Sequence, residues 1–115
     1  MIVGNYLNLE AKTIDSSEAK NAKMKVLVDA KSGWEDYVMR VVEVEENGYT
    51  PKHSHPWQHV NYIISGTGEL MIDGKINEVE EGSFAYVPAN ALHQFKNVGK
   101  KSFKFICIVP KEGHK

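Results

Sequence analysis

The sequence predicts a single all-β domain of the sandwich or barrel type. Its 115 residues are the length of one domain, which we assign to residues 1–115. Turn-forming residues, among them Asn47-Gly48, Asp73-Gly74 and Gly82, punctuate short apolar segments at intervals of roughly 8 to 15 residues. Within those segments apolar and polar residues alternate with a period of two, as they do in strands with one buried face.

Residues 1–23 form an N-terminal arm in this prediction. Residues 16–23 carry Ala, Glu and Lys without an apolar stripe, so we expect a loop or one or two helical turns there. The first clear strand pattern, residues 24–28, places Met24, Val26 and Val28 on one face.

The next strand pattern covers residues 37–45. We expect Glu43 and Glu45 to face water, and the other face then carries Val38, Arg40, Val42 and Val44 into the interior. Residues 70–72 and 75–76 flank Asp73-Gly74, which is the signature of a type I′ hairpin.

The last strand pattern covers residues 103–109. An outward Lys104 turns Phe103, Phe105, Cys107 and Val109 inward and leaves Ile106 and Ile108 on the opposite face. Together with the apolar residues of the arm, these two isoleucines exceed what a small barrel can enclose. We therefore expect a homodimer in which residues 1–23 lie at the interface.

Composition excludes several classes of protein. Fourteen basic and fifteen acidic residues give a net charge of −1, which argues against a nucleic-acid or anionic-membrane partner. No stretch approaches the roughly 20 apolar residues that span a bilayer, and the first residues do not resemble a signal peptide. The single cysteine fits a reducing compartment, and we expect a cytoplasmic protein.

Histidine spacing is the strongest functional signal. His53, His55 and His59 fall within seven residues, and His93 follows a proline-containing turn. On a strand, His53 and His55 would point to the same face. Four unrelated surface or core histidines are the alternative, but the H-x-H-x3-H pattern favours a shared divalent metal, because imidazole is the commonest protein ligand of transition metals.

Two segments around these histidines resemble the two motifs of the cupin superfamily. Residues 48–66 are similar to the first motif, with a glycine at each end and H-x-H between them. Residues 82–97 are similar to the second, with Gly82, Pro88, His93 and Asn97 at the expected spacing. The resemblance implies a double-stranded β-helix, the cupin jelly-roll barrel, with a metal inside.

The sequence departs from these motifs at three places. The first glycine lies one residue nearer to H-x-H than usual, and Asn90 stands where the second motif has a glycine. His59 replaces the usual glutamate, which makes the chain similar to the tetra-histidine, manganese-binding bacterial cupins. The resemblance therefore implies His53, His55, His59 and His93 as ligands of one ion per chain.

The implied site has a distinctive charge. Four neutral imidazoles leave a divalent ion at +2, so we expect open positions that prefer anionic ligands. Manganese is the expected metal, while iron, zinc, nickel or copper could occupy purified protein. A closed tetrahedral zinc site is the structural alternative. Because each imidazole binds only when neutral, we expect metal loss below about pH 6.

Strand parity adds candidate pocket residues, which are Arg40, Trp57, Asn61, Phe95, Phe105 and Cys107. Arg40 would anchor a carboxylate or enolate, or else hold its head in solvent. Cys107 would be an inert apolar residue or would be oxidised beside a redox metal. We expect His114 to be a solvated tail residue, and six glutamates to be exposed: Glu43, Glu45, Glu46, Glu78, Glu80 and Glu81.

Three functions remain open from the sequence. The resemblance favours a manganese- or iron-dependent oxidoreductase of the dioxygenase type that acts on a small molecule. A metal-dependent isomerase or lyase would stabilise an enolate, but it needs a base that the inward positions do not supply. A binding or sensor protein without catalysis is the third, because this barrel hosts many functions.

Overall fold

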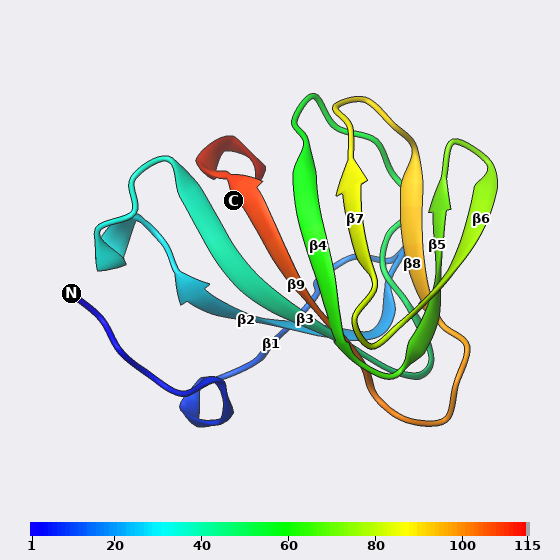
Figure 1. The fold of residues 1–115 in the computed structure, drawn as a ribbon, viewed down its shortest axis with the longest axis horizontal. Coiled ribbons are helices and arrows are strands. Elements are labelled where there is room, and N and C mark those ends of the chain that lie inside the picture. The colour runs from blue at the N-terminus through cyan, green and yellow to red at the C-terminus, as the bar shows by residue number, and fades with distance from the viewer. Residues whose placement is uncertain (115) are drawn as a thin grey trace.

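The computed structural model describes residues 1–114, which form nine strands and three short 3-10 helices (Figure 1). The elements in chain order are η1 (Tyr6–Asn8), β1 (Lys12–Thr13), β2 (Lys20–Val28), η2 (Ala30–Ser32), β3 (Tyr37–Tyr49), β4 (His59–Ser65), β5 (Thr67–Ile72), β6 (Lys75–Glu80), β7 (Phe84–Val87), β8 (His93–Asn97), β9 (Phe103–Pro110) and η3 (Lys111–Gly113).

All strand pairs are antiparallel, and the sheet curls into a nearly closed barrel. The main path runs β6-β5-β8-β3-β9-β4-β7, and β2 adds to the other side of β3 and pairs with β1. The 13-residue strand β3 is the hub, since it contacts β2, β8 and β9. The predicted all-β jelly-roll barrel is therefore confirmed.

The inward positions match the predicted parity. Val42, Val44, Phe103 and Phe105 are at most 6% exposed and belong to the main apolar cluster, which Ile63, Leu70, Val87 and Phe95 complete. The rings of Phe95 and Phe105 stack with centroids 4.0 Å apart. Val38, Cys107 and Val109 form a second, smaller cluster with Val26 and Trp57.

Two turn predictions are confirmed by the backbone. Asp73 and Gly74 both have positive φ, 48° and 85°, and join β5 to β6 in the geometry that a type I′ turn requires. Asn90 has φ 70°, so asparagine fills the left-handed position where the motif usually has glycine.

Two other predictions are wrong. Residues 20–23 belong to β2 rather than to a loop or helix, because Ala22 pairs with Val44 and is buried. Glu43 is 6% exposed, because Lys23 and Lys25 lie 4.0 and 3.9 Å from its carboxylate on the outer face of the sheet. Burial raises the pKa of Glu43, an effect that Lys104 partly offsets.

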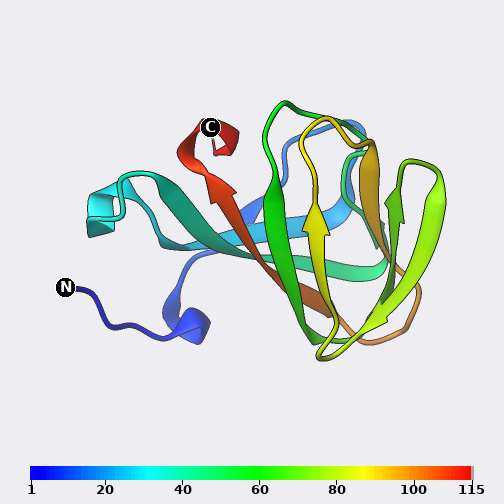
Figure 2. The same ribbon diagram turned by 45° about the horizontal axis from the view of Figure 1, so that its top comes forward.

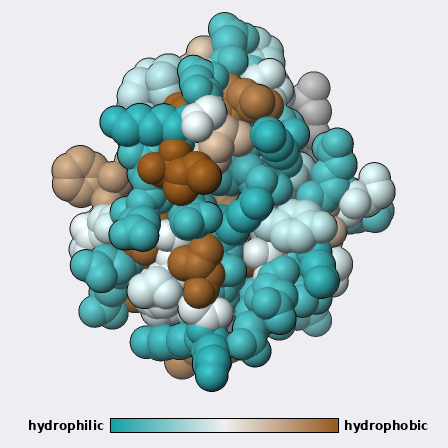
Figure 3. Space-filling view, turned by 90° about the vertical axis from the view of Figure 1, so that its right-hand side faces the viewer, coloured by the Kyte–Doolittle hydropathy of each residue, from teal (hydrophilic) through white to brown (hydrophobic). Residues whose placement is uncertain are grey.

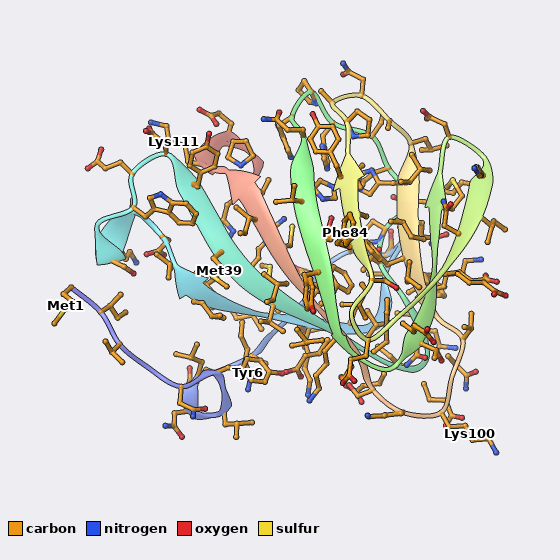
Figure 4. All side chains as sticks on the ribbon, viewed as in Figure 1. Met1, Tyr6, Met39, Phe84, Lys100 and Lys111 are labelled. Carbon is orange, nitrogen blue, oxygen red and sulfur yellow. The ribbon has the colours of Figure 1, made fainter. Side chains whose placement is uncertain are left out.

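Apolar side chains remain on the outside of the barrel. Val60, Tyr62, Phe84 and Tyr86 are 43% to 82% exposed on the outer face of β4 and β7. Figure 4 shows Phe84 on β7, Met39 on β3, and Tyr6 on the arm that extends beside β2 and β3. The face formed by the β5–β6 hairpin is largely hydrophilic with isolated hydrophobic residues (Figure 3). The homodimer that would cover the apolar faces stays a prediction.

None of the helices within residues 1–114 has the length and apolar character of a membrane-spanning segment.

Candidate metal centre

Four histidines gather at one end of the barrel, where the β3–β4 loop, the β7–β8 loop and η3 lie together (Figures 1 and 2). His53 and His55 come from the β3–β4 loop, and His59 and His93 begin β4 and β8. His53 and His55 lie outside the regular strands, yet their imidazoles come close together, as the i, i+2 spacing suggested for a strand. His53 makes an isolated β-bridge with His93, through backbone hydrogen bonds of 3.1 and 2.9 Å, because Pro51 and Pro56 interrupt the ladder.

Three of the imidazoles are close enough together to share an ion, and the fourth, His59, contacts this group. Potential ligand atoms of His53, His55 and His93 all lie within 4.8 Å of one another. Nε2 of His59 lies 3.3 Å from Nε2 of His93, which joins the fourth ring to that group. Ring centroids of His53, His55 and His59 are each 4.9 Å from that of His93.

Three of the rings are oriented by hydrogen bonds through Nδ1. His55 Nδ1 donates to the carbonyl of Trp57 at 2.8 Å, and His93 Nδ1 donates to the carbonyl of Ala91 at 3.0 Å. His59 Nδ1 lies 2.6 Å from Oδ1 of Asn61. The amide of Asn61 is fixed in that orientation because its Nδ2 donates to the carbonyl of Ile106.

These hydrogen bonds fix the tautomer of each of the three imidazoles. A ring that donates through Nδ1 keeps a lone pair on Nε2 when it is neutral. The two Nε2 atoms of His59 and His93 therefore face each other at 3.3 Å with no proton between them. Two metal–nitrogen bonds of about 2.0 to 2.1 Å would place such nitrogens about 2.9 to 3.4 Å apart. The donor set fits a shared divalent ion.

Burial keeps these rings neutral. Desolvation lowers the pKa of His59 and of His93 to about 4, although the bonds to Asn61 and Ala91 act in the opposite direction. Desolvation and the charges of His55 and Arg40 also lower the pKa of His53. At neutral pH the Nε2 atoms of His59 and His93 are therefore free of protons and available to a metal ion.

A pocket of about 230 Å³ opens in front of the histidines. The six pocket residues expected from parity, Arg40, Trp57, Asn61, Phe95, Phe105 and Cys107, all line it. Trp57 stacks on His55 with ring centroids 4.7 Å apart and an interplanar angle of 12°. Cys107 is buried, and its sulfur lies 3.8 Å from Nη2 of Arg40.

Other pocket residues could not be found by parity. Ile14, which follows β1, lines the pocket together with Thr50, Pro51 and Gly113. The expectation that His114 is solvated is wrong, because its half-buried ring lies 3.2 Å from Nη1 of Arg40. The turn of η3 brings His114 back over the barrel end, and no strand periodicity extends to this segment.

A comparison with known protein families decides the membership of the chain. The model of the cupin domain matches residues 40–109, which include all four clustered histidines. The chain belongs to the cupin family. Finer membership among the tetra-histidine manganese cupins stays a prediction.

Curated relatives match between 50% and 58% of this chain. An uncharacterized protein of Methanocaldococcus jannaschii is 28% identical over 67 residues, which cover 58% of this chain and 53% of that protein. The chain thus spans about half the length of the curated relatives that it matches.

Solved structures share the whole barrel of this cupin. The polyketide cyclase RemF of Streptomyces resistomycificus superposes with a TM-score of 0.90 at 27% identity, over 96% of this chain and 79% of RemF. A protein of Thermotoga maritima described as a predicted oxalate decarboxylase has a TM-score of 0.85 at 16% identity, over 95% and 98% of the two chains. The second likeness shows the fold alone.

Proposed function

We propose that this cupin is a metal-dependent oxidoreductase of the dioxygenase type, in which His53, His55, His59 and His93 hold one divalent ion. The observation that carries the proposal is the convergence of four imidazoles, with paired Nε2 lone pairs 3.3 Å apart, at an open pocket. A structural zinc site would instead be closed to ligands.

The residues around the histidines have separate tasks in this proposal. Bound there, manganese or iron would supply one-electron redox chemistry with dioxygen, whereas zinc or nickel would supply only Lewis-acid activation. Asn61 and the carbonyls of Trp57 and Ala91 fix the ring orientations, so that the nitrogen lone pairs are preorganised. Phe95 and Phe105 keep the inner wall apolar and exclude water from it.

Charge points to an anionic substrate. None of the described residues that line the pocket is an aspartate or glutamate, whereas Arg40 is among them. With neutral histidines, both a bound divalent ion and Arg40 would contribute positive charge to the pocket. We therefore propose a small, anionic organic substrate that meets the cluster through the mouth beside Trp57.

Oxygen consumption tests this function. Protein loaded with manganese or iron is presented with a panel of enolates, unsaturated acids and thiols, and oxygen uptake is compared with product formation. We expect uptake with the redox metals, none with zinc, and none in His59→Ala. Glu78→Gln, an exposed change remote from the cluster, serves as the matched control. Turnover without oxygen uptake contradicts an oxidoreductase, and saturable binding without turnover indicates a sensor.

A second candidate is a non-redox enzyme that stabilises an enolate, such as a cyclase or lyase. The likeness to the polyketide cyclase RemF favours it, because that match combines the same barrel with 27% identity. The pocket weakens it, since no carboxylate among its described lining residues can serve as the base. Equal activity of the zinc and manganese forms under anaerobic conditions would favour this non-redox enzyme over an oxidoreductase.

A further inference from the structure

Arg40 differs in kind from the other cations of this chain. It is the only arginine among fourteen basic residues, and the other thirteen are lysines. Its side chain lines the pocket from β3. Arginine presents a planar fork of donors that matches a carboxylate with two parallel hydrogen bonds, which lysine cannot reproduce.

The guanidinium of Arg40 has only weak partners. Nη1 lies 3.2 Å from Nδ1 of His114, and Nη2 lies 3.8 Å from the sulfur of Cys107. Nε is buried without any hydrogen-bond partner. Among residues 1–114, no carboxylate forms an ion pair with it within 4.0 Å. A half-buried cation to which residues 1–114 supply no counter-ion is unfavourable, and a bound anion would complete its environment.

Strand register connects Arg40 with the histidines. Arg40 lies opposite Cys107 on β9, and Cys107 lies opposite Asn61 on β4. Asn61 holds the ring of His59. The guanidinium and the histidine cluster therefore line one pocket from neighbouring strands, and the positive charge of Arg40 reaches the cluster, where it helps to lower the pKa of His53 and His59.

We propose that Arg40 anchors the carboxylate of a small ligand with an apolar body, and that His114 occupies this anchor until the ligand displaces it. The proposal deepens the proposed function by naming the chemical class of its substrate. It rests on that function only for what happens to the ligand afterwards, since binding at Arg40 needs no reaction.

The walls of the pocket define the rest of the ligand. Met24, Val42, Phe95, Phe105 and Trp57 line it, so most of its inner surface offers carbon or aromatic atoms. A ligand whose carboxylate meets Arg40 would lay its body against the stacked pair Phe95 and Phe105, toward the histidines. An aromatic or unsaturated carboxylic acid fits this combination better than a sugar or a phosphate ester.

The C-terminal turn is suited to being displaced. The amide of Lys111 donates to the carbonyl of Asp36 at 3.0 Å, and their side chains form a solvent-exposed ion pair at 3.9 Å. Gly113 packs so closely on Trp57 and Val109 that an added Cβ would overlap both. Trp57 in turn stacks on His55. Besides this packing, the polar contacts that the described residues make with the segment are few, namely those of Asp36 and Arg40, and sparse polar contacts are a property of elements that open locally.

Benzoate and its neutral isostere benzamide test the anchor. Binding to zinc-loaded protein is measured by calorimetry, and the Nε resonance of the single arginine is followed by ¹⁵N NMR. We expect benzoate to bind in preference to benzamide and to shift the Arg40 signal. Arg40→Gln should weaken benzoate binding about tenfold to hundredfold, because charge-assisted hydrogen bonds are lost. His114→Ala should strengthen it several-fold, because the competing imidazole is gone.

Matched controls distinguish loss of the Arg40 anchor from a general change in charge or folding. Lys100→Gln removes an exposed positive charge from the β8–β9 loop, away from the pocket and from the C-terminal turn, so benzoate affinity should stay within about twofold of the wild type. Thermal unfolding of each variant shows that it is folded. The same titrations on metal-stripped protein separate binding at Arg40 from binding at the metal.

Several outcomes overturn the proposal. Equal affinity for benzoate and benzamide, or an Arg40→Gln variant that binds benzoate like the wild type, removes the anchor. Unchanged or weaker binding in His114→Ala removes the competition by His114. If oxygen uptake fails for every substrate while benzoate binding still depends on Arg40, the proposed oxidoreductase fails and the carboxylate site stands.

Discussion

The two ends of the barrel interior are built by the same strands but serve different purposes. At the packed end, away from the histidines, the inward side chains are Val42 and Val44 of β3, Phe103 and Phe105 of β9, Ile63 of β4 and Phe95 of β8. At the open end, which carries the pocket, the same strands contribute Arg40 of β3, Cys107 of β9, Asn61 and His59 of β4, and His93 of β8. The packed end is almost entirely apolar, and its buried amide, Asn97, donates to the backbone carbonyls of Val44 and Lys101, whereas the open end collects nitrogen and sulfur.

Burial alone does not separate these ends. Ile63 and Phe105 are each 2% exposed, while His59 and His93 are 5% and 4% exposed. The two ends differ in the free energy of burial. Burying an apolar side chain stabilises the fold, whereas burying an imidazole costs free energy unless it finds a hydrogen-bond partner or a ligand. The packed end therefore supplies stability, whereas the imidazoles of the open end are satisfied by Asn61, by backbone carbonyls and, in our proposal, by an ion.

The largest effect is expected at the packed end. Phe103→Ala removes a fully buried ring from the main cluster and should lower the free energy of unfolding by about 3 to 5 kcal/mol, measured by chemical denaturation. Phe84→Ala is the matched control, because Phe84 is 82% exposed and its loss should change stability little in the monomer. Equal losses in the two variants would contradict the assigned packing.

The open end should make metal-free protein sensitive to acid. His59 and His93 have a pKa of about 4 in the folded chain and the ordinary 6.5 when unfolded. Between those values the unfolded chain binds protons that the folded chain refuses, so the free energy of unfolding falls as pH drops from about 6.5 to 4. Each ring contributes about 3 kcal/mol to this loss.

The variant His59→Gln isolates this dependence. Denaturation of metal-free wild type and variant is compared at pH 7 and pH 4.5, so that the other titrating groups cancel. The wild type should lose more free energy of unfolding over this interval than the variant does. Parallel loss in both proteins would show that His59 is not held neutral by burial.

A smaller effect is expected when the support of a ring is removed. Asn61→Ala deletes the acceptor for Nδ1 of His59 and should weaken metal binding about 10- to 100-fold in a chelator competition assay. Asn77→Ala is the control, because that amide also bonds a backbone carbonyl, of Leu70, but lies away from the cluster. Equal metal affinity of the two variants would show that Asn61 does not position the ring of His59 for metal binding.

The smallest effect is expected at a turn remote from both ends. Gly74 has φ 85° and nothing within 4 Å of an added Cβ, so Gly74→Ala strains only the backbone. We expect a loss of about 1 kcal/mol of unfolding free energy and unchanged metal affinity. A loss of unfolding free energy as large as that of Phe103→Ala would contradict the assignment of only local backbone strain to this substitution.

The sequence allowed the packed end to be predicted almost completely. Period-two alternation, with outward glutamates in β3 and an outward lysine in β9, was sufficient to orient these strands, and turn residues located the β5–β6 hairpin. The motif spacing alone was sufficient to group the four histidines. Parity gives opposite faces of a strand but not which face is covered, and for this reason Glu43, which Lys23 and Lys25 cover, was assigned to water.

At the open end, the positions of side chains could be predicted only for residues on regular strands. His53 and His55 reach the cluster from a loop, and His114 reaches Arg40 from a 3-10 turn, so their positions depend on tertiary packing that no periodicity encodes. Ile14 joins the pocket in the same way, from the segment between β1 and β2. Irregular segments at the barrel mouth are thus where the sequence pattern was least informative.

Metal stoichiometry and affinity show whether the four histidines hold one ion together. Equilibrium dialysis of manganese against wild type and against His59→Ala distinguishes a site of four imidazoles from one of three. We expect one ion per chain in the wild type and at least tenfold weaker binding in His59→Ala. Binding of equal strength in both proteins, or no saturable binding in the wild type, would contradict a site of four imidazoles.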